Sequence, residues 1–508
     1  MKSTFILATS VVAMAPATSL MAKSKVKAPR PNIIVILADD LGYGDISANG
    51  SKTISTPNID ALAHGGVRFT RGYATSATST PSRYALMTGM YPWKNADAKI
   101  LPGDAPLIIS GEQPTMPKMF RSAGYATGAV GKWHLGMGRG HIDWNEQISP
   151  CVNDVGFGYS CMMAATQDRV PTVYIENGRV AGLDKNDPLY VDYHKNFEGE
   201  PTALTNPEML KLGWSQGHNN SVHNGIPRIG FQKGGVSARW KDEEMAFYFL
   251  DKVKTFIDKN KSNPFFLYYG LNEPHVPRTP NGMFVGKSGM GARGDAILEA
   301  DWCVGELIKK LTEDGLLDNT IIVFTSDNGP VLDDGYKDQA EELVGNHKPA
   351  WIYRGGKYSL FEGGTRIPLI VYWKGHIQPK TSEAMVCQMD FFASFADLLG
   401  QKIEKGLDSR DYLSAFMGKS DKARKDLVIE AAGRLAYRCD NWVMIPPYKG
   451  PARNETKNEL GNLKEYTLYD LSNDAPQQIN VADKYPRKLE EMKNRLKAIR
   501  AASDQTHN

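Results

Sequence analysis

Four apolar runs, each of strand length and each followed directly by polar residues, constrain the fold of this chain more than any other feature. They lie at residues 32–37, 125–130, 264–269 and 321–325, with helical patterns at residues 57–63, 243–259 and 296–313 between them. The runs do not alternate with polar residues, which is typical of strands in a sheet covered on both faces. Strands that alternate with helices predict an α/β fold with a mostly parallel sheet.

Polar side chains follow the carboxyl ends of these runs. In chain order they are Asp39 and Asp40, Lys132 and His134, His275, and Asp327 with Asn328. Because parallel strands place their carboxyl ends at one edge of a sheet, we expect these side chains to converge in one crevice. The Asp and Asn side chains offer only hard oxygen ligands, which suit Ca²⁺ or Mg²⁺. Taken alone, an Asp-Asp pair after a strand is more often a turn or a helix cap.

Most of the other candidates are cationic. This set consists of Arg83, Lys132, His134, His275 and Lys357. Cations around a divalent metal describe a receptor for a small anion with several oxygens, a sulfate or phosphate ester. Singly, each basic residue fits a solvated surface charge better, and each histidine fits a structural role better.

The most specific string runs from Ser79 to Gly89, STPSRYALMTG. It predicts a short helix with Thr80 as N-cap, Pro81 at the first helical position and Gly89 as the C-terminal stop. Ser79 would then lie at the positive end of the helix, where backbone amides favour an anion. Arg83 lies four residues later and can lean toward the same side. A plain capped helix is the alternative that propensity alone leaves open.

This string resembles the signature of the sulfatase family at all of its fixed positions. Further segments that resemble the family lie at residues 32–44, 55–60, 131–136, 325–329, 354–357 and 362–366. The resemblance runs from about Pro31 to about Gly375 and is closest to the arylsulfatase A-like branch, which includes bacterial glycan sulfatases. It implies an alkaline-phosphatase-like, mostly parallel sheet between helices, with a smaller C-terminal α+β subdomain.

The resemblance also implies a mechanism. In this family the signature Cys or Ser is oxidised to formylglycine, and a Ser, here Ser79, is matured by a radical-SAM, anaerobic sulfatase-maturating enzyme. A hydroxyl of the hydrated aldehyde attacks sulfur, and Asp327 takes its proton. His134 deprotonates the second hydroxyl, while His275 with Lys357 protonates the leaving alcohol. Arg83, Lys132 and Lys357 hold the sulfate oxygens. By analogy the metal is Ca²⁺ rather than Mg²⁺, and its ligands are Asp39, Asp40, Ser79, Asp327 and Asn328.

The substrate is less constrained. Residues 137–240 form a long stretch of weak periodicity, which in a compact protein is usually functional. Candidates for binding sugar hydroxyls are Asp168, Arg169, His141, Asp143, Arg293, Asp295 and His347. For each of them, a surface ion pair or a loop contact is at least as good an interpretation. The Asp168-Arg169 pair resembles one in bacterial sulfatases that act on galacto-configured sugars.

This resemblance favours the 6-sulfate of galactose or N-acetylgalactosamine, in glycosaminoglycan or mucin glycans. We expect exo-action, and the sequence leaves endo-action open. Glucosamine sulfates, galactose 3- or 4-sulfate and aryl sulfates stay open. A phosphodiesterase or phosphonate hydrolase on the same fold is the first rival of another class, because fold alone does not separate these activities. A non-catalytic glycan-binding relative is the second, although it would be expected to lose members of the cationic set.

The two ends of the chain predict export and a second domain. Residues 1–22 read as a signal peptide, with Lys2 before an apolar stretch and Ala22 at the cleavage site. A disordered tail is the alternative; export would place the protein in the periplasm or outside the cell. We expect a catalytic domain over residues 28–400 and a C-terminal subdomain over 401–508. The latter has strand patterns at residues 427–430, 435–438, 442–445 and 466–469, and a helix at 486–501.

Composition excludes some classes of partner. The formal net charge of +3 and the lack of a dense Lys/Arg tract argue against nucleic acid. After residue 22 no segment reaches the roughly 18 apolar residues of a membrane span. Five cysteines at irregular spacing are neither a disulfide framework nor a zinc pattern, although the sequence leaves a Cys151–Cys161 pair open.

Overall fold

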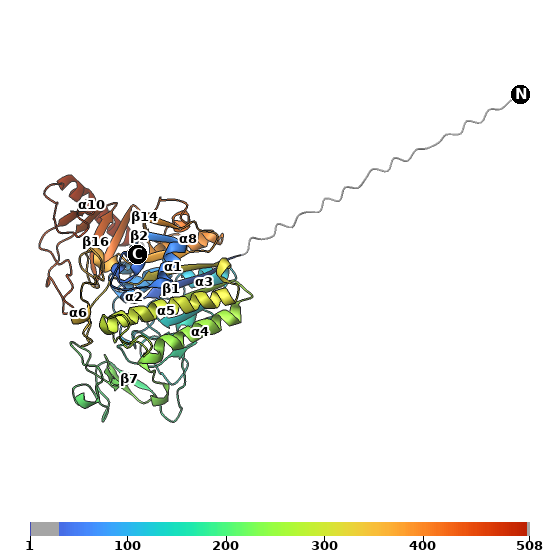
Figure 1. Ribbon diagram of the computed structural model, residues 1–508, viewed down its shortest axis with the longest axis vertical. Helices are drawn as coiled ribbons and strands as arrows, with labels where there is room; N and C mark the ends of the chain where they lie inside the picture. Colours follow the sequence, from blue (N-terminus) through green and yellow to red (C-terminus); the bar gives the residue numbers. More distant parts are fainter. Residues whose placement is uncertain (2–29, 505–508) are drawn as a thin grey trace.

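The computed structural model describes Met1 and residues 30–504 (Figure 1). The predicted signal peptide, apart from Met1, lies outside the described residues. No helix among those residues is long and apolar enough to cross a membrane. All five cysteines lie in the described part of the chain and are free thiols, so Cys151 and Cys161 do not pair.

A ten-stranded mixed sheet forms the centre of the molecule. In spatial order its strands are β14 (Lys380–Cys387), β2 (Val67–Tyr73), β13 (Leu369–Tyr372), β12 (Thr320–Ser326), β1 (Asn32–Ala38), β11 (Phe265–Gly270), β3 (Ala126–Lys132), β4 (Tyr159–Met163), β5 (Ile175–Glu176) and β6 (Arg179–Val180). The five strands from β12 to β4 run parallel, and they include the four predicted runs. β13 is antiparallel to β12 and β2, and β5 and β6 are also antiparallel. The predicted mixed, mostly parallel sheet is confirmed.

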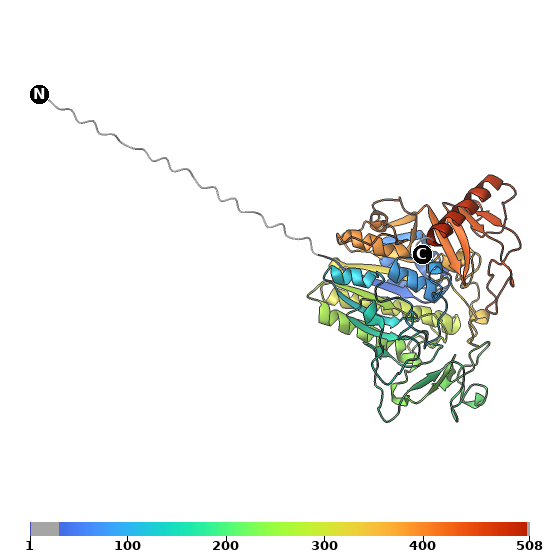
Figure 2. The ribbon, with the colours of Figure 1, turned by 180° about the vertical axis from the view of Figure 1, so that it is seen from behind.

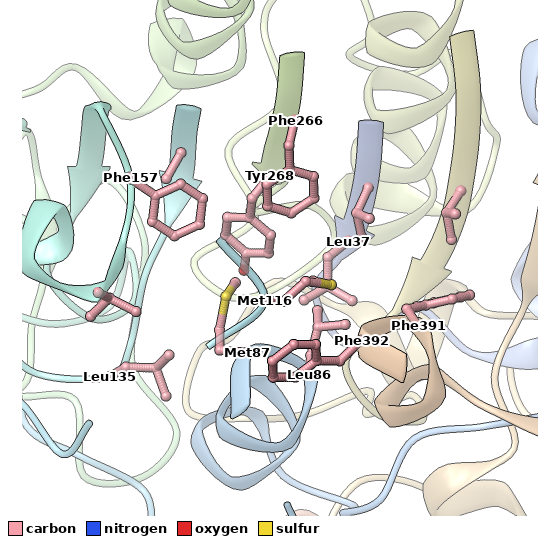
Figure 3. Packing of buried hydrophobic residues seen from close by; sticks show 14 of the residues in the cluster. Leu37, Leu86, Met87, Met116, Leu135, Phe157, Phe266, Tyr268, Phe391 and Phe392 are labelled. Carbon is pink, nitrogen blue, oxygen red and sulfur yellow. The ribbon is translucent and has the colours of Figure 1, made fainter. Parts of the chain in front are cut away.

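Helices cover both faces, which is why the central strands are apolar throughout. One face packs against α1 (Pro57–Gly65), α4 (Met245–Asn260) and α5 (Gly291–Glu313). The other face packs against α2 (Ser79–Thr88), α3 (Met116–Ser122) and α8 (Phe391–Leu398). Along β1, Ile34 and Ile36 belong to the first core, and Val35 and Leu37 to the second. Figure 3 shows the second core, where Leu37 lies near Leu86 of α2.

A second, four-stranded antiparallel sheet forms the C-terminal part. It consists of β15 (Asp426–Ala431), β16 (Arg434–Cys439), β17 (Trp442–Ile445) and β18 (Thr467–Asp470), with α10 (Pro486–Asp504) packed on it through Met492 and Leu496 (Figure 2). The predicted four strands and helix are confirmed. Leu360 and Phe361 of the main body belong to the same buried cluster. The domain boundary at residue 400 stays a prediction, because this core is continuous across it.

The stretch at residues 137–240 contains little regular structure, as its weak periodicity predicts. It holds two small two-stranded antiparallel sheets, β7 (Tyr190–Asp192) with β10 (Phe231–Lys233), and β8 (Val222–His223) with β9 (Ile226–Pro227). The remaining short helices are α6 (Ala340–Leu343), α7 (Glu362–Thr365) and α9 (Leu413–Phe416). The lobe that carries β7 and the second sheet lie toward the same end of the main sheet (Figures 1 and 2).

Candidate active site

The carboxyl ends of β1, β3, β11 and β12 meet in one buried cluster, as predicted. Asp39 and Asp40 follow β1, and the Nζ of Lys132, the last residue of β3, lies 2.6 Å from Asp39 Oδ2. Asp327 follows β12, and its Oδ1 accepts a hydrogen bond of 3.2 Å from the backbone N–H of Asp40. His275 follows β11, with Nε2 at 3.7 Å from Asp40 Oδ2. The strands therefore deliver a set of carboxylates and cations to one point.

Ser79 lies at the positive end of α2 and points at this cluster. Its Oγ donates a hydrogen bond of 2.6 Å to Asp327 Oδ2 and accepts one of 2.9 Å from Arg83 Nε. The helix begins two residues earlier than predicted, with Thr78 as N-cap and Ser79 as its first residue. The predicted capping role of Thr80 is wrong, because its hydroxyl donates to the backbone oxygen of His134 at 2.9 Å instead. Gly89 ends the helix in the left-handed conformation with φ of 67°, as expected.

The oxygen atoms of the cluster fit a divalent metal ion. Asp39 Oδ1 and Asn328 Oδ1 are buried and have no hydrogen-bond partner among the described residues. Burial raises the pKa of Asp39 well above its ordinary value in spite of Lys132, so a further positive charge beside this carboxylate would stabilise its ionised form. Asn328 Nδ2 meanwhile donates to Asp40 Oδ1 at 2.8 Å and fixes the amide so that its oxygen is available. Hard oxygen donors of this kind suit Ca²⁺ or Mg²⁺.

Cations hold the other carboxylates in their charged form. Burial alone would raise the pKa of Asp327, but Arg83 and Lys132 outweigh it and hold the pKa at about 2. The Nη2 of Arg83 lies 2.8 Å from Asp327 Oδ2. Lys357 contacts Asp40 Oδ2 at 2.8 Å and Asp334 Oδ2 at 2.7 Å. Burial would lower the pKa of Lys357, but Asp334 and Asp40 raise it well above its ordinary value, so the lysine is charged.

Two buried histidines present one ring nitrogen each to the site. The Nε2 of His134 lies 3.0 Å from the backbone oxygen of Leu101, while Nδ1 has no partner in the described structure. The ring therefore donates from Nε2 and keeps a lone pair on Nδ1. His275 lies with Nδ1 at 2.6 Å from the backbone oxygen of Val276, which leaves Nε2 toward the carboxylates. Burial and nearby lysines lower the pKa of both histidines well below the ordinary value, so both rings are neutral.

A small pocket opens above Ser79. Its lining consists of Ser79, Ile100, His134, Asp168, Arg169, His218, His275, Asp334, Lys357 and Tyr358. Ser79 lies at its floor, with an exposed fraction of 3%.

One wall of the pocket is a hydrogen-bonded cluster around Asp168. Arg169 Nη1 contacts Asp168 Oδ1 at 3.0 Å, and His218 Nε2 contacts Asp168 Oδ2 at 2.9 Å. Burial would raise the pKa of Asp168, but Arg169 and His218 hold it well below its ordinary value, so it is an ionised acceptor. The backbone permits this packing because Gly335 has a φ of 113° and a Cβ there would lie 1.9 Å from His218 Nδ1. Only glycine fits that position.

Sequence reasoning missed four residues that line the pocket, Ile100, His218, Asp334 and Tyr358. Asp334 follows Asp327 by seven residues and Tyr358 follows Lys357 directly, so proximity to the motifs was a usable signal for both. Tyr358 donates from its hydroxyl to Asp334 Oδ1 at 3.1 Å, and Asp334 in turn contacts Lys357. His218 lies in the irregular stretch, where no local pattern distinguishes it from other histidines.

Five of the seven predicted sugar-binding residues lie outside the pocket. They are His141, Asp143, Arg293, Asp295 and His347. His141 and Asp143 are exposed on the surface. The carboxylate of Asp295 accepts from the backbone of Gly286 and Ser288, at 2.8 and 2.9 Å, and fixes the loop before α5. Of the predicted set, the structure brings only Asp168 and Arg169 to the pocket.

Arg293 and His347 instead bind the buried carboxylate of Asp45. Arg293 donates to both oxygens of Asp45, at 2.9 and 2.6 Å, and His347 Nε2 lies 2.7 Å from Oδ1. Asp45 belongs to the short helix η1 (Tyr43–Asp45), which follows the Asp39–Asp40 pair closely. Sequence spacing gave no indication of this long-range ion pair. The ion pair anchors the segment that follows Asp39 and Asp40, the candidate metal ligands.

This ion pair predicts how stability depends on pH. Burial would raise the pKa of Asp45, but Arg293 and His347 lower it from 3.8 to about 2. A carboxylate with a depressed pKa stabilises the fold above its unfolded pKa, and this contribution is lost as the pH falls toward 2. We expect Asp45→Asn to lower the melting temperature strongly at pH 7 and less at pH 3. Differential scanning calorimetry checks this, and a gap that stays constant or widens on acidification contradicts it.

The fold and the site define a hydrolase of anionic esters, built on an alkaline-phosphatase-like sheet with a hydroxyl at a helix N-terminus among cations. Residues 31–401 match the family model Sulfatase, and the chain therefore belongs to the sulfatase family. It is 50% identical over 476 residues to an N-acetylgalactosamine-6-O-sulfatase of Bacteroides thetaiotaomicron, which covers 93% of each chain. It is 29% identical over 513 residues to human arylsulfatase A, covering 93% of this chain and 88% of that one.

A solved structure from work on glycosaminoglycan metabolism by Bacteroides thetaiotaomicron superimposes with a TM-score of 0.92. It is 50% identical and covers 93% of this chain and 99% of its own. The protein is accordingly a sulfuric ester hydrolase, as predicted. The rival interpretations as a phosphoryl-transfer enzyme or a non-catalytic glycan-binding protein are not favoured.

Proposed function

We propose that this protein is an exported, exo-acting carbohydrate sulfatase that removes the 6-sulfate from N-acetylgalactosamine or galactose in glycosaminoglycan or mucin glycans. The observation that carries the proposal is the position of Ser79. Its hydroxyl lies at the floor of the pocket, 2.6 Å from an ionised carboxylate and ringed by buried cations. We further propose that Ser79 is matured to formylglycine and that the protein works in the periplasm.

The groups that the protein would carry when active have defined places. Asp39, Asp40, Asp327 and Asn328, with residue 79, would hold Ca²⁺, which neutralises sulfate oxygens and increases the acidity of a nearby hydroxyl. Formylglycine at residue 79, as the hydrated aldehyde, supplies a nucleophilic hydroxyl that a plain serine would offer only weakly.

Asp327 is the proton acceptor for the hydroxyl at position 79. Its Oδ2 receives the Ser79 hydrogen bond directly, and its low pKa keeps it ionised at neutral pH. Arg83 donates to the same two oxygens, Ser79 Oγ and Asp327 Oδ2, and so fixes their relative position. A carboxylate at hydrogen-bond distance from the reacting hydroxyl satisfies the geometric requirement for a general base.

His134 is placed to take a second proton at the same position. The contact with Leu101 fixes its tautomer and leaves the Nδ1 lone pair in the pocket. Its lowered pKa keeps this lone pair available in weakly acidic as well as neutral solution. We assign it the deprotonation that releases sulfate.

His275 and Lys357 are placed to serve the leaving alcohol. Both line the pocket on the side of Asp40, and Lys357 is charged. His275 is neutral in the free protein, because burial and the lysines oppose its protonation. A bound sulfate ester brings negative charge beside these cations and reverses that effect, so substrate binding favours the protonated imidazole.

The Asp168 cluster supports the choice of sugar. An ionised carboxylate beside a guanidinium offers both an acceptor and a donor to adjacent ring hydroxyls. The pair lies on the wall above Ser79, where the ring of a 6-sulfated hexose would rest. The name of the Bacteroides thetaiotaomicron relative, an N-acetylgalactosamine-6-O-sulfatase, supports the same assignment.

The test combines mass spectrometry with a substrate panel. The protein is produced in a host that carries the anaerobic sulfatase-maturating enzyme and in one that lacks it, beside Ser79→Ala as control. Sulfate release is assayed on 6-sulfated galacto- and gluco-configured sugars, 4-sulfated N-acetylgalactosamine, an aryl sulfate and an aryl phosphonate ester. We expect loss of two hydrogens at Ser79 and release from galacto-configured 6-sulfates only in the matured protein. Unchanged Ser79 with equal phosphonate hydrolysis in both samples would overturn the proposal.

Removal of the metal tests the oxygen cluster separately. Treatment with a chelator should lower sulfate release at least about 100-fold and should also lower the melting temperature, because buried carboxylates lose their counter-charge. Added Ca²⁺ should restore both. Asp39→Asn serves as control, since its melting temperature should respond much less to chelation. If the chelator changes neither the activity nor the melting temperature of the wild-type protein, the metal assignment is wrong.

A further inference from the structure

A second depression adjoins the active-site pocket and shares part of its wall. It is lined by Gln216, Gly217, His218, Asp334, Tyr358, Pro451, Arg453, Asn454, Glu455 and Thr456. We call it the 451–456 groove. His218, Asp334 and Tyr358 line both spaces, so the groove begins where the pocket ends. No other pocket described in residues 30–504 shares a lining residue with the active site.

We propose that this groove binds the sugar linked to the sulfated residue, so that the enzyme recognises a disaccharide whose sulfated ring fills the pocket. The inference rests on the proposed function. A ring held by Asp168 and His218 over Ser79 must continue toward the open side of the pocket. The boundary formed by His218, Asp334 and Tyr358 leads directly into the groove.

The chemistry of the groove suits a hydroxylated ring rather than a second strongly charged group. Its lining includes the amides of Gln216 and Asn454 and the hydroxyls of Tyr358 and Thr456, which donate and accept hydrogen bonds as sugar hydroxyls require. Arg453 and Glu455, of opposite charge, face the same space and offset each other. The guanidinium of Arg453 is already engaged with Glu459 Oε1 at 2.5 Å and with the backbone oxygen of Lys457 at 2.6 Å. The Arg453 guanidinium is therefore held in place as a hydrogen-bond donor, and its charge is already paired with a carboxylate.

The groove is preformed, because both of its walls are fastened to the catalytic body. Asn458 Nδ2 donates to the backbone oxygens of Lys357, at 3.1 Å, and of Pro330, at 3.3 Å. Lys457 forms an ion pair with Glu341 next to the loop. On the opposite wall, the Ser215 hydroxyl donates to Asp333 Oδ1 at 2.6 Å. A preformed site loses little conformational entropy on binding, which favours affinity.

Binding to an inactive protein tests the groove apart from catalysis. Calorimetry with Ser79→Ala compares 6-sulfated N-acetylgalactosamine with disaccharides that carry it at the non-reducing end. We expect the disaccharides to bind at least about tenfold more tightly. Glu455→Trp in the same background should fill the groove and reduce this ratio toward one. Glu404→Trp, at an equally exposed glutamate that lines none of the described pockets, should leave the ratio unchanged.

Two arms of the experiment distinguish the source of the second sugar. One disaccharide carries a hexuronate beside the sulfated ring, as in glycosaminoglycans, and the other a neutral hexose. A preference for the hexuronate that disappears in Arg453→Ala would identify the former source. Equal affinities for monosaccharide and both disaccharides would overturn the groove while leaving the proposed function intact. Failure of the monosaccharide and disaccharides alike to bind would overturn the proposed function and the groove with it.

Discussion

Asp327→Asn should lower kcat/KM for sulfate release by about 10³- to 10⁴-fold. The neutral amide has nearly the same shape but does not accept a proton, and Asp327 is the acceptor 2.6 Å from Ser79 Oγ. The change also leaves the buried cations Arg83 and Lys132 with one carboxylate fewer, so a lower melting temperature accompanies the loss. Steady-state kinetics at saturating Ca²⁺ checks the prediction, since added metal should not restore the rate.

Asp390 provides the matched control. It is also a fully buried carboxylate paired with an arginine, with Asp390 Oδ2 2.5 Å from Arg424 Nε, but it does not line the active-site pocket. Asp390→Asn should therefore lower the melting temperature while kcat/KM stays within about threefold of wild type. If both variants lose activity equally, the effect of Asp327→Asn is one of stability, and its assignment as proton acceptor is wrong.

His134→Ala should lower kcat by about 10²- to 10³-fold. The substitution removes the Nδ1 lone pair that the Leu101 contact orients toward the pocket. Because burial, Lys132 and Arg169 lower the pKa of His134 well below 6.5, the wild-type ring should stay deprotonated as the pH falls from 8 to 6. Protonation of His134 should then cause no loss of kcat in that range, which a pH–rate profile checks.

His141→Ala is the control for this substitution, because His141 is exposed and does not line the pocket. It should retain wild-type kcat. A wild-type rate that falls tenfold per pH unit below 7, with the slope absent in His134→Ala, would show that the histidine titrates near neutrality. That result would contradict the deprotonated state inferred from its burial.

The sheet and the cluster at its carboxyl edge are predictable from sequence because they follow from local patterns. The residues after a buried strand meet those after its neighbours wherever the strands are parallel, and this rule alone places Asp39, Lys132 and Asp327 together. The helix at Ser79 was predictable in its position and its end. Its first residue was not, because the Thr80 hydroxyl finds a partner in His134 that lies far along the chain.

The wall of the pocket around Asp168 is predictable only in part, for a physical reason. Asp168 and Arg169 are adjacent in sequence, so the pair forms a recognisable pattern. His218 reaches Asp168 across 50 residues of irregular chain, and no periodicity records such a contact. The polar character of Arg293 and His347 suggested a role in sugar binding, but both side chains bind the carboxylate of Asp45 instead. Asp45 lies 248 residues from Arg293 and 302 residues from His347 along the chain.

The burial of α2 has a consequence for the order of events in the life of the chain. All ten residues from Ser79 to Thr88 are buried, so in the folded chain only a small molecule that enters the pocket reaches the Ser79 side chain. The maturation that we propose for Ser79 would therefore precede folding, because another enzyme could not enclose a residue of a buried helix. The segment around Lys357 is held by two side chains that are synthesised after it. Arg434 donates to the backbone oxygen of Tyr358, and Asn458 donates to the backbone oxygen of Lys357. The Lys357 side of the pocket therefore cannot be fixed until residues well beyond the Ser79 helix have been synthesised.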